Sequence, residues 1–325
     1  MRVRVFQSIV CCGLTIPLIV WGDPQAAGDY KGFKIEEIII TAQKRETNIQ
    51  DTPVAISAFD NERLERSGIQ AVSDLSRQVP SLQFSNFGNI VFMSLRGIGM
   101  ENATAGGDPG VAYHMDGVYI GRPSATMANF WDVERMEVLR GPQGTLYGRN
   151  TTGGSVNMIT RKPVDKYQLY GDITVGDNDW LRTRFTANVP LNQMLFSRVS
   201  LIKEDRDGYQ DNRFPGGTEA DDADSVGVRA HLLWDVAEKL EILTTLNYHD
   251  FDGVGSSPVV SGPFPSMIVG GARFDGLTHF NRPHRTSKDT REAGSNTFKG
   301  VTTTVTWDFG SSRFTSITAY HETAY

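Results

Sequence analysis

The chain has 325 residues, 39% of them hydrophobic and 22% charged, which is enough for more than one folded unit with a sizeable core. Its formal net charge of -6 gives no reason to expect nucleic acid as a partner. Cysteine occurs only at Cys11 and Cys12, so the remaining sequence contains no disulfide framework and no thiolate metal site.

The first 27 residues have the pattern of a secretory signal peptide. Arg2 and Arg4 form a basic start, and an apolar stretch follows at 8–21. An uncleaved anchor helix is the alternative, but Pro17 and the short apolar stretch argue against it. We therefore expect residues 1–27 to be removed from the mature protein.

Residues 36–42 read EEIIITA and predict a short extended strand, because three consecutive β-branched residues favour extended backbone. An unpaired strand near a mature N-terminus can add to the sheet edge of a partner protein. An ordinary first strand of a folded domain is the alternative, and the segment alone does not decide between the two.

Residues 45 to about 163 predict one small α+β domain. A capping residue, Asp60, begins a helix that runs to Arg66, and Gly68 ends it. The other expected elements are strands at 54–59, 90–95 and 110–120, a helix at 71–79 and a short helix at 124–130.

The run from Arg135 to Thr160 begins and ends in a strand pattern and is dense in glycine between the two. Glycines in that setting indicate positive φ angles and close backbone approach rather than a flexible tail. A phosphate loop is excluded because no Lys-Ser/Thr follows a glycine pair, and no third glycine completes a dinucleotide fingerprint.

After residue 163 the hydrophobic pattern changes to a period of two. We expect seven strands of about ten residues each, the length of a tilted membrane strand. Their approximate ranges are 169–175, 181–189, 195–204, 226–234, 240–249, 301–309 and 314–325. Short turns at 190–194, 236–239 and 310–312 alternate with long connections at 208–223 and 253–296, as in a bacterial outer-membrane β-barrel.

Three aromatic residues, Trp234, Trp307 and Phe309, fall on the apolar phase of these strands near one end. An aromatic girdle belongs at that position in a membrane barrel. A soluble β-sandwich also alternates, but it needs neither tryptophans at one end nor turns of alternating length.

Metal, cofactor and catalytic sites are not expected. Asp205, Asp207 and Asp211 hint at a calcium loop, but the later acidic ligands and the closing glutamate are missing. The six histidines are scattered without metal-ligand spacing, and no polar cluster for an enzyme can be assembled. We therefore expect no metal, no cofactor and no enzymatic activity.

Five short motifs occur in an order and spacing that resemble the plug domain of TonB-dependent outer-membrane receptors. They are Val79-Pro80-Ser81-Leu82, Leu95-Arg96-Gly97-Ile98-Gly99, Asp116-Gly117-Val118-Tyr119, Arg140-Gly141-Pro142-Gln143-Gly144 and Leu146-Tyr147-Gly148. The pair Tyr113-His114 departs from the family, in which aliphatic residues are usual in this strand. A lone histidine there is more often a packed or solvated residue than a ligand.

The resemblance implies a domain organisation and a fold class. Residues 1–27 are the signal peptide, 28–44 an N-terminal extension with the TonB box, 45–163 the α+β plug, and 164–325 the N-terminal part of an antiparallel transmembrane β-barrel. About seven strands are present, whereas family barrels have roughly 22, and seven strands cannot close around a plug. We therefore expect a truncated piece of a longer receptor.

The resemblance also implies site residues. The segment that would bind TonB, which we call the box, is Glu36, Glu37, Ile38, Ile39, Ile40, Thr41 and Ala42. Charged plug residues that would pair with the inner barrel wall are Arg96, Arg135, Glu137 and Arg140, because buried charges need partners. Candidate ligand contacts are Phe84, Asn86, Phe87, Asn89, Met100 and Asn102.

The function implied is energy-coupled import of a scarce ligand, such as a siderophore or another iron complex, across the bacterial outer membrane. The implied partners are TonB, outer-membrane lipid and the small ligand, and no nucleic acid. The alternatives are a soluble periplasmic or secreted plug-like binding module and a non-functional receptor fragment. The sequence does not identify the ligand.

Overall fold

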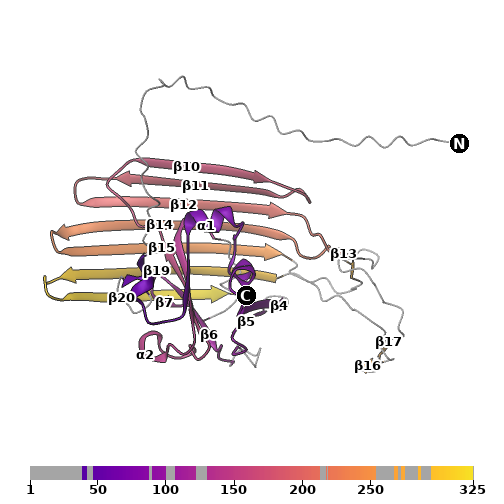
Figure 1. Ribbon diagram of the computed structural model, residues 1–325. Coiled ribbons are helices and arrows are strands. Elements are labelled where there is room, and N and C mark those ends of the chain that lie inside the picture. Colours follow the sequence, from indigo (N-terminus) through magenta and orange to yellow (C-terminus); the bar gives the residue numbers. More distant parts are fainter. Residues whose placement is uncertain are drawn as a thin grey trace, which may run out of the picture. The chain divides into compact units, whose positions relative to one another are not determined.

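The computed structural model describes residues 39–41, 47–87, 90–99, 107–121, 130–212, 217, 219–253, 267–269, 272–274, 285–286 and 294–324. Residues from Glu37 onward form one compact unit (Figure 1). Within the described ranges, no helix is long and apolar enough to cross a membrane. The expected signal peptide lies outside the described residues, as does the expected helix at 124–130 except for Phe130.

A five-stranded sheet forms the centre of the predicted plug, in the strand order β3-β8-β9-β6-β7. The strands are β3 (Ile56–Asp60), β8 (Val133–Arg140), β9 (Gly154–Thr160), β6 (Val111–Met115) and β7 (Val118–Tyr119). Strands β6 and β9 run parallel, and the other neighbouring pairs are antiparallel. The run from Arg135 to Thr160 therefore supplies most of β8 and all of β9, two of the three interior strands of the sheet.

Further elements surround this sheet. They are β1 (Ile39–Ile40), β2 (Thr47–Asn48), η1 (Ile49–Asp51), α1 (Asn61–Arg66), η2 (Val72–Arg77), β4 (Leu82–Phe87), β5 (Ile90–Leu95) and α2 (Gly144–Tyr147). Asp60 caps α1 as expected, since its carboxylate accepts a hydrogen bond from the backbone N–H of Arg63. The helix expected at 71–79 is a shorter 3₁₀ helix, and α2 was not expected.

The apolar core of the plug lies between the sheet and η2. Val72, Leu75 and Val79 are fully buried and pack in one cluster with Met136 of β8 and Val156 of β9. Their spacing of three and four residues puts them on one face of a helical segment, so the sequence pattern located this face correctly. The 3₁₀ geometry changes the winding of the segment but not the face that it buries.

Gly154 is the first residue of β9, and its backbone conformation explains why the dense run has glycine at this position. Its φ of 148° is a conformation that residues with a Cβ rarely adopt, and a Cβ at this position would lie 2.1 Å from the carbonyl oxygen of Leu139. The same Cβ would lie 2.5 Å from the side chain of Leu95. Gly154 therefore allows β8, β9 and the end of β5 to approach closely.

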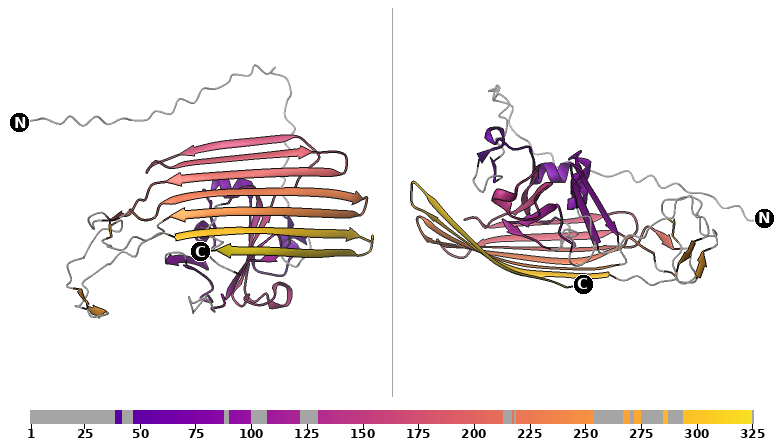
Figure 2. Two further views of the ribbon diagram at one scale, coloured as in Figure 1. Left: turned by 180° about the vertical axis from the view of Figure 1, so that it is seen from behind. Right: turned by 90° about the horizontal axis from the view of Figure 1, so that it is seen from below.

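Seven long antiparallel strands form a second, curved sheet, which we call the wall (Figure 2). In spatial order they are β10 (Gln168–Val175), β11 (Leu181–Pro190), β12 (Leu195–Arg206), β14 (Ala223–Ala237), β15 (Leu240–Gly253), β19 (Gly294–Asp308) and β20 (Arg313–Ala324). Each of the seven pairs with the next of the seven along the chain, so all seven expected strands are confirmed.

The long connections of the wall hold short strands of their own. They are β13 (Asp211–Asn212), β16 (Met267–Val269), β17 (Ala272–Phe274) and β18 (Arg285–Thr286). Strand β13 pairs with β18, which joins the two long connections to each other. The sequence pattern did not predict these strands because each has only two or three residues.

The two faces of the wall differ in chemistry. On one face polar side chains are buried, among them Arg198, Ser200, Arg229 and His231. On the other face large apolar side chains are exposed; Leu246, for example, is 55% exposed. This arrangement is that of a barrel whose lumen holds the plug and whose outside faces lipid.

Aromatic residues gather at one end of the exposed face. Trp234 lies opposite Ile242 of β15, and Trp307 lies opposite Leu240 of the same strand, so both are near the β14–β15 turn. The rings of Trp307 and Phe309 are 4.7 Å apart. The position of all three residues agrees with the expected girdle at one membrane interface.

Candidate functional site

The N-terminal segment Ile39–Thr41 is docked on the plug. Strand β1 pairs antiparallel with β2, with Ile39 opposite Asn48 and Ile40 opposite Thr47. The side chain of Ile40 is fully buried in a small cluster with Leu139 and Tyr147. This segment is the described part of the predicted box; Glu36, Glu37, Ile38 and Ala42 lie outside the described residues.

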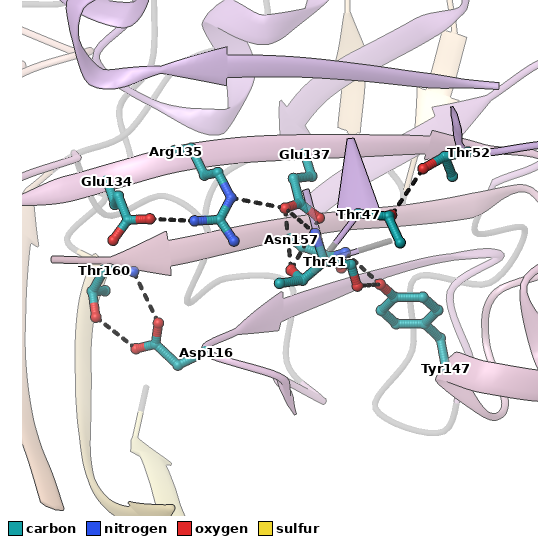
Figure 3. Close-up of polar contacts among 10 residues, drawn as sticks. All are labelled: Thr41, Thr47, Thr52, Asp116, Glu134, Arg135, Glu137, Tyr147, Asn157 and Thr160. Atoms are coloured by element: carbon teal, nitrogen blue, oxygen red, sulfur yellow. Dashed lines mark hydrogen bonds and ion pairs between the residues drawn. The ribbon is translucent and has the colours of Figure 1, made fainter. Parts of the chain in front are cut away.

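Thr41 carries most of the polar contacts of the docked segment (Figure 3). Its backbone N–H donates to Glu137 Oε1 at 2.8 Å, and its hydroxyl donates to the same oxygen at 3.1 Å. The hydroxyl of Tyr147 donates to the carbonyl oxygen of Thr41 at 3.2 Å. Hydrogen bonds to a carboxylate are stronger than neutral ones, so Glu137 is the principal anchor of this segment.

Glu137 is fully buried and also pairs with Arg135, whose Nε donates to Oε1 at 2.9 Å. A second nitrogen of Arg135 pairs with Glu134 (Figure 3). Burial, and next the negative charge of Glu137, raise the pKa of Tyr147 to about 12. Tyr147 therefore keeps its proton at neutral pH and remains a donor to Thr41.

Four charged residues were predicted to pair with the barrel wall. Two of them, Arg135 and Glu137, pair with each other, and Glu137 also accepts hydrogen bonds from Thr41 of the box segment. Arg96 lies in an exposed turn with a φ of 55°, and the Nε of Arg140 is buried without a hydrogen-bond partner among the described residues. Pairing of these residues with the barrel wall stays a prediction.

A different acidic residue, Asp132, joins the plug to the wall. Its carboxylate accepts two hydrogen bonds from Arg198 of β12, at 2.7 Å from Nε and 2.5 Å from a terminal nitrogen, and a third from Ser200. Burial raises the pKa of Asp132, but the hydrogen bonds from Arg198 and Ser200 outweigh this effect and leave the pKa below its usual value. Asp132 is therefore ionised and supplies the counter-charge to the buried guanidinium of Arg198.

The neighbouring residue, Trp131, fits into a notch of the wall. A Cβ on Gly227 would lie 2.9 Å from the Trp131 ring, so only glycine leaves room for it. Arg229 lies over the ring at 4.5 Å and donates to the backbone oxygen of Trp131 at 2.8 Å. His249 stacks on the ring at 5.7 Å. A cation over an aromatic face is attractive, particularly where water is excluded.

We call Trp131, Asp132 and their wall partners the plug seat. The sequence pattern placed Gly227 and Arg229 on the polar phase of a wall strand, which is correct. It did not identify Trp131 and Asp132, because an aromatic and an acidic residue before a strand do not by themselves indicate a distant partner. The available signal was a glycine and an arginine two residues apart on the polar phase of one strand.

The six predicted ligand residues are only partly described. Phe84 lies in β4, is half-buried and lines a cavity of about 820 Å³ between the plug and the wall. Asn86 and Phe87 follow in the same strand. Asn89, Met100 and Asn102 lie outside the described residues. A role for any of them in ligand binding stays a prediction.

Residues 48–155 match the family model of the TonB-dependent receptor plug domain. The chain is 29% identical over 184 residues to the pesticin receptor of Yersinia pestis, covering 56% of this chain and 27% of that receptor. It is 29% identical over 197 residues to the metal-pseudopaline receptor CntO of Pseudomonas aeruginosa, covering 58% of this chain and 26% of the relative.

Solved structures share the fold. The ferric yersiniabactin uptake receptor FyuA from Yersinia pestis superposes with a TM-score of 0.68 at 20% identity, over 83% of this chain and 41% of that receptor. Plug and wall together thus have the fold of part of an outer-membrane β-barrel with an internal plug. The match of residues 48–155 and the named relatives support the TonB-dependent receptor family for this chain. The chain spans about a quarter of the length of the two curated relatives named above.

Proposed function

We propose that the protein imports an iron–siderophore complex, or a related metal chelate, across the bacterial outer membrane with energy delivered by TonB. The observation that carries this proposal is the docked segment Ile39–Thr41. It is an extended strand held to the plug by a two-residue pairing and by hydrogen bonds centred on Thr41. Such a strand can be displaced and added to the sheet of a partner.

The names of the relatives support the ligand class. They include a metal-pseudopaline receptor, a ferripyoverdine receptor and a ferric yersiniabactin uptake receptor, each named for a metal chelate. Phe84, Asn86, Phe87, Asn89, Met100 and Asn102 are the proposed ligand contacts. The proposed domain bounds are 1–27 for the signal peptide, 28–44 for the extension with the box, 45–163 for the plug and 164–325 for the barrel part.

The contacts between plug and wall support a mechanism in which the plug moves. The plug seat joins the two parts through ionic and hydrogen-bonded groups such as Asp132 and Arg198. Water can replace such partners once it enters, whereas it cannot compensate for separated apolar surfaces. A pull on the box can thus shift the plug against the barrel without exposing a large apolar interface.

The test is uptake of radioactive iron by cells that lack their own siderophore receptors and express the full-length receptor gene. The probes are iron-loaded yersiniabactin, pyoverdine and a catecholate siderophore. Ile39→Pro removes a backbone donor and should reduce TonB-dependent uptake at least about tenfold, because strand addition needs that donor. The matched variant Ile39→Val keeps the donor and should retain uptake.

The proline variant separates two effects. It also weakens the pairing of β1 with β2, which alone would make the box more accessible and would not reduce uptake. A loss of uptake therefore reports on pairing with TonB. Normal uptake by Ile39→Pro, or uptake that continues in cells without TonB, would contradict the proposal.

A further inference from the structure

A row of three buried polar residues crosses the plug sheet and ends at the box segment. His114 of β6 lies opposite Asn157 of β9, and Asn157 lies opposite Glu137 of β8. Residues that face each other across paired strands point to the same side of a sheet. All three side chains are buried, and Glu137 is the residue that binds Thr41.

Hydrogen bonds connect this row to Thr41 by a second route. His114 Nδ1 lies 2.9 Å from the hydroxyl of Ser155, which donates to Asn157 Oδ1 at 2.6 Å. The side-chain nitrogen of Asn157 donates to the hydroxyl of Tyr147 at 3.1 Å, and that hydroxyl donates to the carbonyl of Thr41. We call these five residues the polar chain; Figure 3 draws its end at Asn157, Tyr147 and Thr41.

The donors of the polar chain fix its direction. The single proton of the Ser155 hydroxyl is donated to Asn157, so His114 Nδ1 must itself donate to Ser155. Each following group then has one consistent role as far as Thr41. Because hydrogen-bonded neighbours orient one another, a change at His114 affects how the Tyr147 hydroxyl is held.

His114 also contacts the Tyr147 ring directly. The two rings meet edge to face, with centroids 5.2 Å apart and planes at 69°. This geometry is one that aromatic rings prefer. His114 thus restrains Tyr147 at its ring through packing and at its hydroxyl through Ser155 and Asn157.

We propose that His114 is a positioning residue that sets how firmly the segment Ile39–Thr41 is docked on the plug. An aliphatic residue at this position would keep the strand but could not donate to Ser155. The docked segment would then lose the oriented Tyr147 hydroxyl and rely on Glu137. The consequence for import rests on the proposed function, whereas the docking itself does not.

The experiment is hydrogen exchange measured by mass spectrometry on the full-length receptor in detergent, following the peptide that contains Ile40 and Thr41. His114→Leu should raise its exchange rate about fivefold, the factor expected for the loss of one net hydrogen bond. His114→Asn places a side-chain N–H near the position of Nδ1 and should restore the wild-type rate to within about twofold.

A neighbouring residue provides the matched control. Tyr113 is also buried in β6, but its hydroxyl contacts Met158 at 3.4 Å and it packs in the apolar core on the other side of the sheet. Tyr113→Phe should leave exchange at Thr41 unchanged. If His114→Leu does not fold, Ser155→Ala interrupts the same chain with a much smaller change in volume and should give the same increase.

Two results would overturn the inference: unchanged exchange at Thr41 in both His114→Leu and Ser155→Ala, or an equal rise in the peptides of β6, β9 and Thr41. The second would mean that His114 only stabilises the sheet. Failure of the proposed function is distinguishable, because Ile39→Pro then imports normally while exchange at Thr41 still responds to His114.

Discussion

Arg198 of the wall and Asp132 of the plug form a two-point ion pair in which each side chain is only 3% exposed. The φ of Asp132 is 52°, in the left-handed region, which turns its carboxylate toward Arg198 and Ser200. Aspartate and asparagine tolerate this conformation better than most residues. The contact between plug and wall thus includes a residue whose backbone conformation is unfavourable in free energy.

Asp132→Asn should weaken the plug seat strongly, since the variant keeps a residue that suits the backbone but leaves the Arg198 guanidinium buried without its counter-charge. The expected loss is about 3 kcal/mol of unfolding free energy, from urea denaturation of the receptor in detergent. Glu62→Gln is the control, because Glu62 forms an exposed pair with Arg66 and should cost under about 0.5 kcal/mol. Equal losses of unfolding free energy in the two variants would show that the ion pair of the plug seat stabilises the receptor no more than an exposed ion pair does.

The same carboxylate predicts an acid-sensitive step. Its pKa in the folded protein lies below the usual 3.8, so its contribution is complete above that value and is lost as the pH falls through the lower folded pKa. The urea midpoint of the wild-type receptor should therefore drop more between about pH 5 and pH 3 than that of Asp132→Asn. Parallel curves for the two proteins would refute the assignment.

Glu137→Gln should make the box easier for TonB to bind. The variant loses the charge that holds the Thr41 N–H and hydroxyl, so the undocked form becomes more populated. A ligand that binds only the undocked form then binds with a lower apparent Kd, here by about threefold to tenfold. Binding of the purified TonB C-terminal domain by calorimetry measures this. Glu134→Gln, which alters a neighbour of Arg135 without touching Thr41, should leave the Kd unchanged.

Gly154→Ala should prevent the plug from folding normally. The added methyl group would collide with the Leu139 carbonyl and the Leu95 side chain in a backbone conformation that alanine avoids. We expect a loss of more than about 4 kcal/mol, measured by denaturation, or no folded receptor at all. Gly144→Ala is the control, because a Cβ at Gly144 meets nothing within 4 Å. A folded and equally stable Gly154→Ala protein would contradict the close approach described here.

Leu246→Arg tests the outward face of the wall. Leu246 lies in the middle of β15, opposite Ala230 and Val301, and should face lipid. An arginine near the bilayer midplane costs about 2–4 kcal/mol, which unfolding of the receptor in lipid vesicles measures. Leu246→Met should cost little. If the arginine variant is as stable as the methionine variant, this face does not contact lipid, as the alternative of a soluble module would require.

Local patterns were sufficient for most of the fold. Alternation at residues such as Val228 and Arg229 gave the strands of the wall and the face that each residue occupies, because the side-chain period of a strand is two. The plug motifs around Arg140 and Tyr147 led to the family, which the comparisons confirmed. The 3₁₀ type of η2 could not be predicted from the sequence pattern, since 3₁₀ and α-helical segments bury similar positions over so short a length.

The contacts between segments that are distant in the sequence could not be predicted from local patterns. Asp132 and Arg198 are 66 residues apart, and Thr41 and Glu137 are 96 apart. A charge pattern indicates that a residue will need a partner but not which one it will meet. For this reason the contacts of Glu137 with Arg135 and Thr41 were not predicted from the sequence, and its pairing with the barrel wall stays a prediction.

The seat of Trp131 and Asp132 is made entirely by β12, β14 and β15, which are consecutive neighbours in the wall. These contacts therefore need only these three of the seven wall strands to have paired. The plug can dock on this early part of the sheet, and the later strands can then be laid around it. A plug docked at that stage would not have to be threaded into a finished barrel.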